Sequence, residues 1–231
     1  MQQTIGMISS YISRLLFRTR PTEVLIDTLT AQDLERLARY DGTLPYTDSR
    51  VRALVWEVKY YAHSRASKLA GEYLAQLLLA EASDIVGTPL LIPMPMHPKR
   101  RKQRGHNQTE VLCESALRSL GVEKNWGKNS LARRLSEDSR GRPEDFFEAA
   151  FFYAPHALIR IKHTAPQQGL ERHDRLKNLK DAMSADSSKV KGRVCIVVDD
   201  VSTTGASFAE AKRALKEAGA SEVRSIALAQ S

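Results

Sequence analysis

The stretch from Val194 to Ser207 constrains the fold of this chain more than any other part of the sequence. It opens with an unbroken apolar run, Val194 to Val198, which predicts a strand buried on both faces, because a half-exposed strand would alternate apolar and polar residues. Two acids, Asp199 and Asp200, end this strand, and a short loop leads into a predicted helix over residues 208–218. A buried strand, a tight loop and a helix in succession indicate an α/β fold.

The loop after this strand has the composition of a phosphate site. Backbone N–H groups gather there at the positive end of a helix dipole, and Ser202, Thr203 and Thr204 add hydroxyl donors. The Asp199 and Asp200 carboxylates would repel a phosphate, so we expect them to accept hydrogen bonds from sugar hydroxyls or to hold a divalent cation. The combination predicts a sugar phosphate, and the chain has neither a dinucleotide-binding nor a P-loop glycine pattern.

Charge and cysteine content narrow the classes of partner and compartment. The net charge of +8 favours anionic partners such as nucleotides, pyrophosphate or nucleic acid, without choosing among them. Cys113 and Cys195 are the only cysteines, which excludes a disulfide framework or a thiolate metal site and makes a reducing cytoplasm the expected location. No apolar run approaches the length of a membrane span, and the oligomeric state has no signature in the sequence.

The region before the sheet predicts helices. We assign residues 1–45 to an N-terminal helical segment, whose first part is a basic amphipathic helix ended by Pro21 and Thr22, with Thr30 capping a second helix over residues 31–40. The first helix either packs on the domain or lies on a membrane surface or nucleic acid. Helices from Asp48 or Ser49 and over residues 64–82 should cover the active face. Lys59 and Tyr60 lie at their junction, where an exposed Lys and a partly buried Tyr are the simplest interpretation.

A second anion site is predicted after the strand Leu90–Ile92, where alternating prolines stop further ladder pairing. A basic loop follows, and Asn107 with Glu110 has the pattern of a capping pair for a helix over residues 108–120. A pyrophosphate group, an electrostatic nucleic-acid patch and a solvated loop all fit this composition. The basic residues of the loop are Lys99, Arg100, Arg101, Lys102 and Arg104.

The stretch around the acid pair resembles the phosphoribosyl pyrophosphate (PRPP) signature of the type I phosphoribosyltransferases. This resemblance implies that the acids bind the ribose hydroxyls and that the loop binds the 5′-phosphate. It also implies a type I phosphoribosyltransferase-like α/β fold over residues 46–231, mainly a parallel sheet with helices on both faces and an N-terminal helical cover. The residues that carry it are Asp199, Asp200, Val201, Ser202, Thr203, Thr204, Gly205, Ala206 and Ser207.

Two further blocks resemble the competence protein F (ComF) branch of this family. Residues 92–95 with 104–108 match its P-x-P and R-G-x-N-Q pattern, which implies a pyrophosphate side formed by His97, Lys99, Arg100, Arg104, Asn107 and Gln108. A second block implies a flexible loop that folds over PRPP, carried by Thr164, Gln167, Gly169, Leu170, Arg175 and Asn178. Many ComF-like proteins begin with a Cys-rich zinc module. No cysteine precedes Cys113 here, so no zinc is expected.

The function implied is transfer of a phosphoribosyl group from Mg-PRPP to an unidentified nitrogen acceptor, with Asp199, Asp200 and Arg175 as the catalytic residues. The alternative implied by the ComF resemblance is a DNA-uptake protein that holds single-stranded DNA or a competence helicase and uses the fold without transferase activity. An insertion is expected at about residues 121–152, and its aromatic residues could serve as core, dimer surface or base-stacking site.

Overall fold

The computed structural model describes residues 20–121, 151–162 and 179–231. The predicted basic helix before Arg20 and most of the expected insertion lie outside these residues. The same holds for the flexible-loop residues Thr164, Gln167, Gly169, Leu170, Arg175 and Asn178. Within the described residues, no helix is long and apolar enough to cross a membrane.

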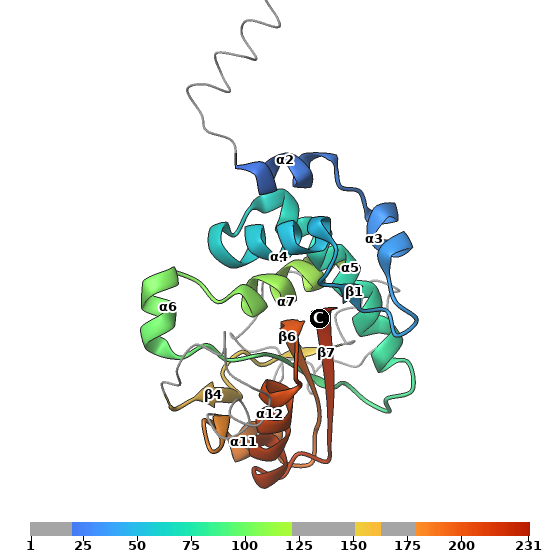
Figure 1. The fold of residues 1–231 in the computed structure, drawn as a ribbon. Helices are drawn as coiled ribbons and strands as arrows, with labels where there is room; N and C mark the ends of the chain where they lie inside the picture. Colours follow the sequence, from blue (N-terminus) through green and yellow to red (C-terminus); the bar gives the residue numbers. More distant parts are fainter. Residues whose placement is uncertain (1–19, 122–150, 163–178) are drawn as a thin grey trace, which may run out of the picture.

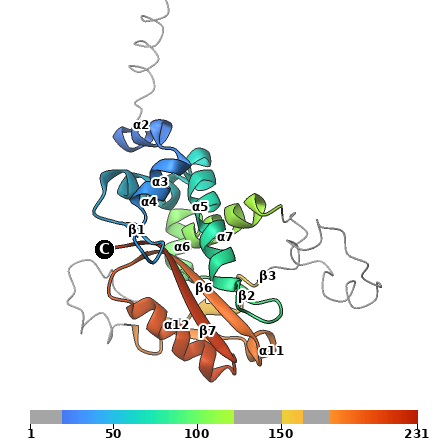
Figure 2. The same ribbon diagram turned by 90° about the vertical axis from the view of Figure 1, so that its right-hand side faces the viewer.

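A five-stranded sheet forms the centre of the molecule, with the strand order β1-β7-β6-β2-β3 and every neighbouring pair parallel. A separate antiparallel ribbon joins β4 to β5. Figures 1 and 2 show the long strands β6 and β7 side by side at the centre. The strands are β1 (Leu44–Pro45), β2 (Leu90–Pro93), β3 (Phe152–Tyr153), β4 (Leu158–Arg160), β5 (Met183–Ala185), β6 (Val194–Ser202) and β7 (Glu222–Gln230).

Helices cover both faces of this sheet. One core joins the helices α4, α5 and α7 to Ile196 and Val198 of β6, and a second core joins α12 to Cys195 and Val197 of the same strand. Because β6 contributes to both cores, its apolar run is continuous, and the predicted fold class is confirmed. The helices are α2 (Pro21–Thr28), α3 (Ala31–Leu37), α4 (Ser49–Tyr61), α5 (Ser64–Ala82), α6 (Pro98–Arg104), α7 (Gln108–Ser119), α11 (Ser187–Val190) and α12 (Ala206–Glu217).

The N-terminal part of the described chain contains two elements that the sequence analysis did not predict. Pro21 begins the helix α2, because proline lacks the N–H that the first helical position leaves unused. Residues 44–45 form the edge strand β1 beside β7, so the N-terminal segment contributes to the sheet. Thr30 caps α3 as predicted, in a reciprocal capping box with Asp33.

Three further predictions change around the site. The predicted end of the central strand at the acid pair was wrong, because β6 continues through Asp199 and Asp200 to Ser202. The basic stretch after the prolines is not a loop but the helix α6, which Pro98 begins. Phe151 is buried in the first core and Phe152 opens β3, so the end of the expected insertion is already part of the sheet layer.

Candidate functional site

The acid pair lies at the carboxyl end of β6, where ligands bind in open parallel sheets. Each carboxylate accepts a hydrogen bond from the backbone N–H of the next residue, with both N–O distances at 2.9 Å. Asp200 is only 6% exposed, and its Oδ2 is buried with no hydrogen-bond partner among the described residues. The Lys59 ammonium Nζ lies 4.0 Å from this oxygen. A buried carboxylate oxygen without a donor is unfavourable, so this geometry suits a ligand that brings one.

The two carboxylates also shift each other's protonation. Burial and the adjacent Asp200 carboxylate raise the pKa of Asp199 well above its usual value, while Lys59 acts in the opposite direction. Two neighbouring carboxylates that are poorly solvated repel each other, which favours the protonated form of Asp199. A cation or a hydroxyl donor between the two acids would remove this repulsion.

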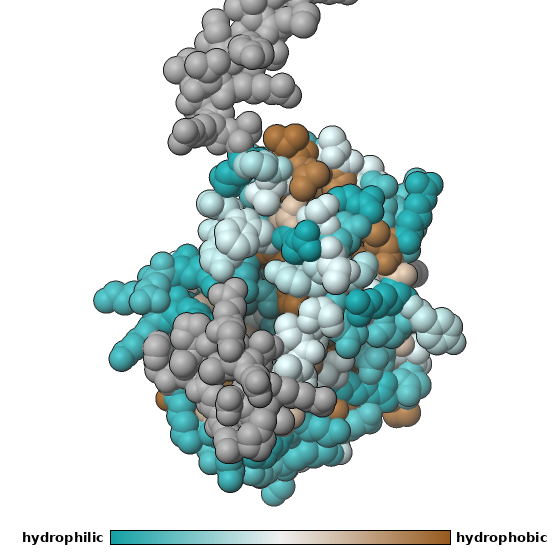
Figure 3. All heavy atoms as spheres, in the orientation of Figure 1, coloured by the Kyte–Doolittle hydropathy of each residue, from teal (hydrophilic) through white to brown (hydrophobic). Residues whose placement is uncertain are grey.

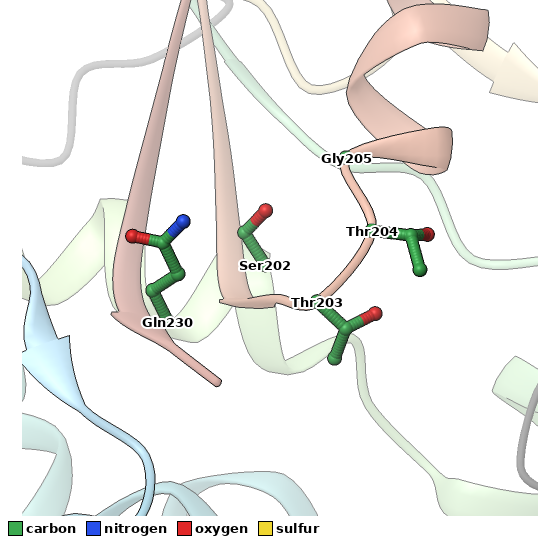
Figure 4. A pocket seen from close by; sticks show the side chains of 5 residues that line it. All are labelled: Ser202, Thr203, Thr204, Gly205 and Gln230. Carbon is green, nitrogen blue, oxygen red and sulfur yellow. The ribbon is translucent and has the colours of Figure 1, made fainter. Parts of the chain in front are cut away.

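A pocket of about 360 Å³ opens at the loop that follows β6. Figure 4 shows Ser202 and Gln230 on neighbouring strands and the other lining residues on the loop into α12. Gly205 has φ +72°, a conformation that side chains rarely adopt, and as the N-cap of α12 it has no side chain to cap the helix. The Ala206 N–H donates to Thr204 Oγ1 (3.5 Å), and the next first-turn N–H groups of α12 can bind an anion. The pocket is lined by Ser202, Thr203, Thr204, Gly205 and Gln230.

The second predicted anion site surrounds α6 and the start of α7. The Met94 N–H donates to the Val198 carbonyl (2.8 Å), which fixes the end of β2 beside β6. The Asn107 side chain is buried; it donates to the Met94 carbonyl (3.1 Å) and accepts from the Thr109 N–H at the start of α7. Asn107 thus holds the backbone of this corner in place.

Some basic residues near this corner bind side chains of the same corner, and others face the solvent. Arg101 forms a two-bond ion pair with Glu110, and Arg104 donates to the Gln108 side chain (2.9 Å). The His97 ring accepts from the Lys99 N–H and caps α6. Lys99 is exposed, and Figure 3 shows hydrophilic side chains over the α6 end of the molecule.

The phosphoribosyl transferase domain family matches residues 129–231 of the chain. Competence protein F of Haemophilus influenzae is 30% identical over 68% of this chain and 59% of its own length. The DNA utilization protein YhgH of Salmonella typhi is 29% identical over 74% of this chain and 63% of its own. Residues 129–231 of this chain thus carry a phosphoribosyl transferase domain, and the chain as a whole is similar to ComF-like proteins.

The match to the ComF-like relatives is partial in length, since this chain spans 63% and 59% of the two proteins. Among solved structures, the orotate phosphoribosyltransferase of Mycobacterium tuberculosis in complex with PRPP is similar at a TM-score of 0.34. That likeness has 15% identity and covers 92% of this chain and 90% of that one.

Two cations of this ComF-like site were missed by the sequence analysis. Lys59, interpreted there as an ordinary exposed residue, reaches Asp200 from the end of α4. Arg160 of β4 is half-buried; burial and the charge of Arg100 lower its pKa, and Asp199 opposes this shift, so it lies within electrostatic reach of both. Neither residue has a sequence signal, because only the packing of α4 and β4 brings them to β6.

Proposed function

We propose that this ComF-like chain binds PRPP together with Mg²⁺ and transfers its phosphoribosyl group to a nitrogen acceptor, with release of pyrophosphate. The observation that carries this proposal is the buried Asp200 Oδ2, which lacks a donor and lies on the strand that ends at an uncapped helix. A phosphorylated pentose supplies hydroxyl donors for the acids and an anion for the helix end. One molecule therefore satisfies both unmatched groups.

The roles of the residues follow from their places. Asp199 and Asp200 accept hydrogen bonds from the ribose hydroxyls, and the loop of residues 201–207 with the start of α12 binds the 5′-phosphate. The pyrophosphate lies toward α6, near His97, Lys99, Arg100 and Arg104, while Asn107 and Gln108 hold the corner that orients them. The flexible-loop residues Thr164, Gln167, Gly169 and Asn178, with Arg175 as a catalytic residue, remain part of the proposal without structural support.

The acid pair also fits Mg²⁺, which proteins usually hold with one or two carboxylates while phosphate oxygens and water complete the shell. The described residues contain no group of three or more His, Cys, Asp or Glu side chains that could hold a metal alone. A carboxylate pair with one unpartnered oxygen is therefore suited to share a cation with a phosphorylated ligand. When bound, Mg²⁺ would neutralise charge on the pyrophosphate.

The chemistry asked of these residues is displacement at the anomeric carbon. The bond from C1 to the pyrophosphate oxygen breaks and its electron pair leaves with pyrophosphate, while the acceptor nitrogen forms the new bond to C1. Positive charge develops on the sugar as the bond stretches, as in glycoside cleavage. The Asp199 and Asp200 carboxylates stabilise that charge, and the α6 cations stabilise the departing anion.

A calorimetric titration with PRPP and Mg²⁺ tests this proposal. We expect Asp199→Asn with Asp200→Asn to weaken PRPP binding about a hundredfold or more, because two charge-assisted contacts are lost. The matched control is Asp27→Asn, an exposed acid on α2, which should bind PRPP as the wild type does. Wild-type affinity in the double variant would contradict the assignment of the site. Pyrophosphate release across a panel of bases then identifies the acceptor.

A second candidate function is binding of single-stranded nucleic acid, and the outer surface of α4 favours it. The Trp56 and Tyr60 side chains are 46% and 41% exposed, and their ring centroids lie 4.3 Å apart. The Arg104 guanidinium carbon lies 5.0 Å from the Tyr60 ring centroid. Exposed aromatic rings beside cations form the platforms on which unpaired bases stack. The names of the relatives, competence protein F and DNA utilization protein, agree with such a role.

Binding of a fluorescent oligothymidylate tests this second function. Trp56→Ala with Tyr60→Ala should weaken binding about tenfold or more, because each stacked base loses a ring. Tyr40→Ala removes an exposed tyrosine of the segment between α3 and β1 and should change nothing. Equal losses in both variants, or none, would contradict an α4 platform. A helicase partner stays a prediction from the family resemblance.

A further inference from the structure

The last turn of α4 is fixed from two sides by its own residues. Glu57 is 0% exposed, and its carboxylate accepts from Arg20 through Nε (3.0 Å) and Nη2 (2.8 Å), and from the Thr22 hydroxyl. These contacts tie α4 to the start of α2. On the other side, the Val58 carbonyl accepts from His106 Nε2 (3.1 Å), which ties α4 to the segment before α7. The residue that follows, Lys59, is thus carried by backbone held at two points.

Lys59 points from this fixed turn toward the acid pair. Its Nζ lies 4.0 Å from Asp200 Oδ2, beyond hydrogen-bond distance, and its side chain is 32% exposed. The same Nζ lies 5.9 Å from the Tyr60 ring centroid, and Arg104 approaches that ring as well. The Lys59 ammonium therefore lies near Asp200 and shares the Tyr60 ring as a neighbour with Arg104 of α6.

The distance of 4.0 Å separates two explanations for this lysine. A counter-ion for Asp200 would be expected to donate directly to Oδ2, yet that oxygen has no donor. A half-exposed ion pair at this distance contributes little stability. An ammonium with three donors that lies 4.0 Å from Asp200 and shares an aromatic neighbour with the Arg104 guanidinium instead fits an anionic group that both cations can bind.

We propose that Lys59 is a binding residue for the pyrophosphate group of the sugar phosphate, acting together with Arg104. This inference rests on the proposed function, because it takes the ribose to lie on Asp199 and Asp200. The pyrophosphate leaves from the anomeric carbon next to the ribose hydroxyls that these acids hold, so a cation beside Asp200 is placed to meet it. Lys59 thus adds a contact from the helical cover to a site otherwise built from the sheet edge.

The test compares two fragments of the substrate, pyrophosphate with Mg²⁺ and ribose 5-phosphate, by calorimetry at about pH 8. Lys59→Met should weaken pyrophosphate binding about tenfold or more and leave ribose 5-phosphate within about twofold, because one charge-assisted contact is lost on one side only. Lys59→Arg keeps the charge and should recover most of the loss. Lys68→Met removes the same charge from the exposed face of α5 and should behave as the wild type.

The other outcomes overturn the inference. Unchanged pyrophosphate affinity in Lys59→Met, or an equal loss for both fragments, would show that Lys59 serves only the acid pair or the fold. Wild-type protein that binds PRPP but not pyrophosphate would also overturn it. Wild-type protein that does not bind PRPP at all would overturn the proposed function as well, which keeps the two failures distinguishable.

Discussion

Glu57 and Asp200 are both buried acids, but their surroundings differ. Glu57 receives three hydrogen bonds from Arg20 and Thr22, and these lower its pKa although burial acts against them. Asp200 has one carboxylate oxygen without a donor, and its neighbour Asp199 has a pKa raised by burial and by the adjacent charge. The fold thus provides donors for both carboxylate oxygens of Glu57 and leaves one carboxylate oxygen of Asp200 without a donor.

Glu210 on α12 extends the comparison. It is buried like Glu57, and it accepts from the Met183 N–H (3.0 Å) and from Arg213, which ties α12 to β5. Its pKa is lowered by these donors against the effect of burial. Glu57 and Glu210, which join elements of this fold, have donors for both carboxylate oxygens, whereas Asp200 on β6 has a donor for only one. A buried carboxylate oxygen without a donor near a strand end therefore marks the place of a ligand.

The largest expected effect concerns stability. Glu57→Gln should lower the free energy of unfolding by about 2 kcal/mol, because it removes the charge of a buried carboxylate that holds Arg20 and Thr22, while Arg20 keeps Glu23 as an ionic partner. Asp200→Asn should lower it far less, since one oxygen of that side chain has no partner to lose. Urea unfolding of the two variants measures the difference. Equal destabilisation would break the distinction between structural and ligand-binding acids.

A smaller effect is expected in how the free energy of unfolding depends on pH, and Glu57 and Asp199 should change it in opposite directions. The lowered pKa of Glu57 means that its contribution to stability is present at neutral pH and is lost as the pH falls through that pKa. The raised pKa of Asp199 means the reverse, so folding becomes less favourable as the pH rises through it. Asp199→Asn should therefore raise the free energy of unfolding at about pH 8, and the gain should vanish in acid. Urea titrations at several pH values measure this.

Binding should follow the opposite trend, because ribose hydroxyls and Mg²⁺ need the ionised acids. PRPP affinity should fall as the pH drops toward the raised pKa of Asp199. An affinity that stays constant down to the ordinary carboxyl range would show that these acids take no part in binding.

The smallest expected effect comes from replacing a glycine, and it distinguishes a loss of stability through backbone strain from a loss of PRPP binding. Gly205 and Gly192 both have φ +72° and open space where a Cβ would lie. Either one replaced by Ala should lower the free energy of unfolding by about 1 kcal/mol, because the left-handed conformation is strained for a side chain. Only Gly205→Ala should also weaken PRPP binding, since Gly205 lines the pocket. Calorimetry on both variants decides this, and matching losses of affinity would argue against a phosphate loop.

Much of the fold follows from local patterns in the sequence. The helix over residues 64–82 was predicted at its observed ends, and the apolar run of β6 indicated a parallel sheet covered on both faces. Local rules missed α2, since Pro21 can end one helix or begin another, and they failed after Pro98, where basic residues with the composition of a loop form α6. A short-range pattern does not weigh the packing that decides such cases.

The sequence by itself determined the strand, the acid pair and the glycine-containing loop, because these are consecutive residues whose chemistry depends on their order. Only the tertiary structure decided that Lys59 and Arg160 lie near the acids and that Asp200 keeps an oxygen without a donor. Those facts depend on how α4 and β4 pack against β6, across separations in the chain that no local spacing records. Electrostatic contacts act over a few ångströms, and the packing of the core decides which residues that are distant in the sequence come that close.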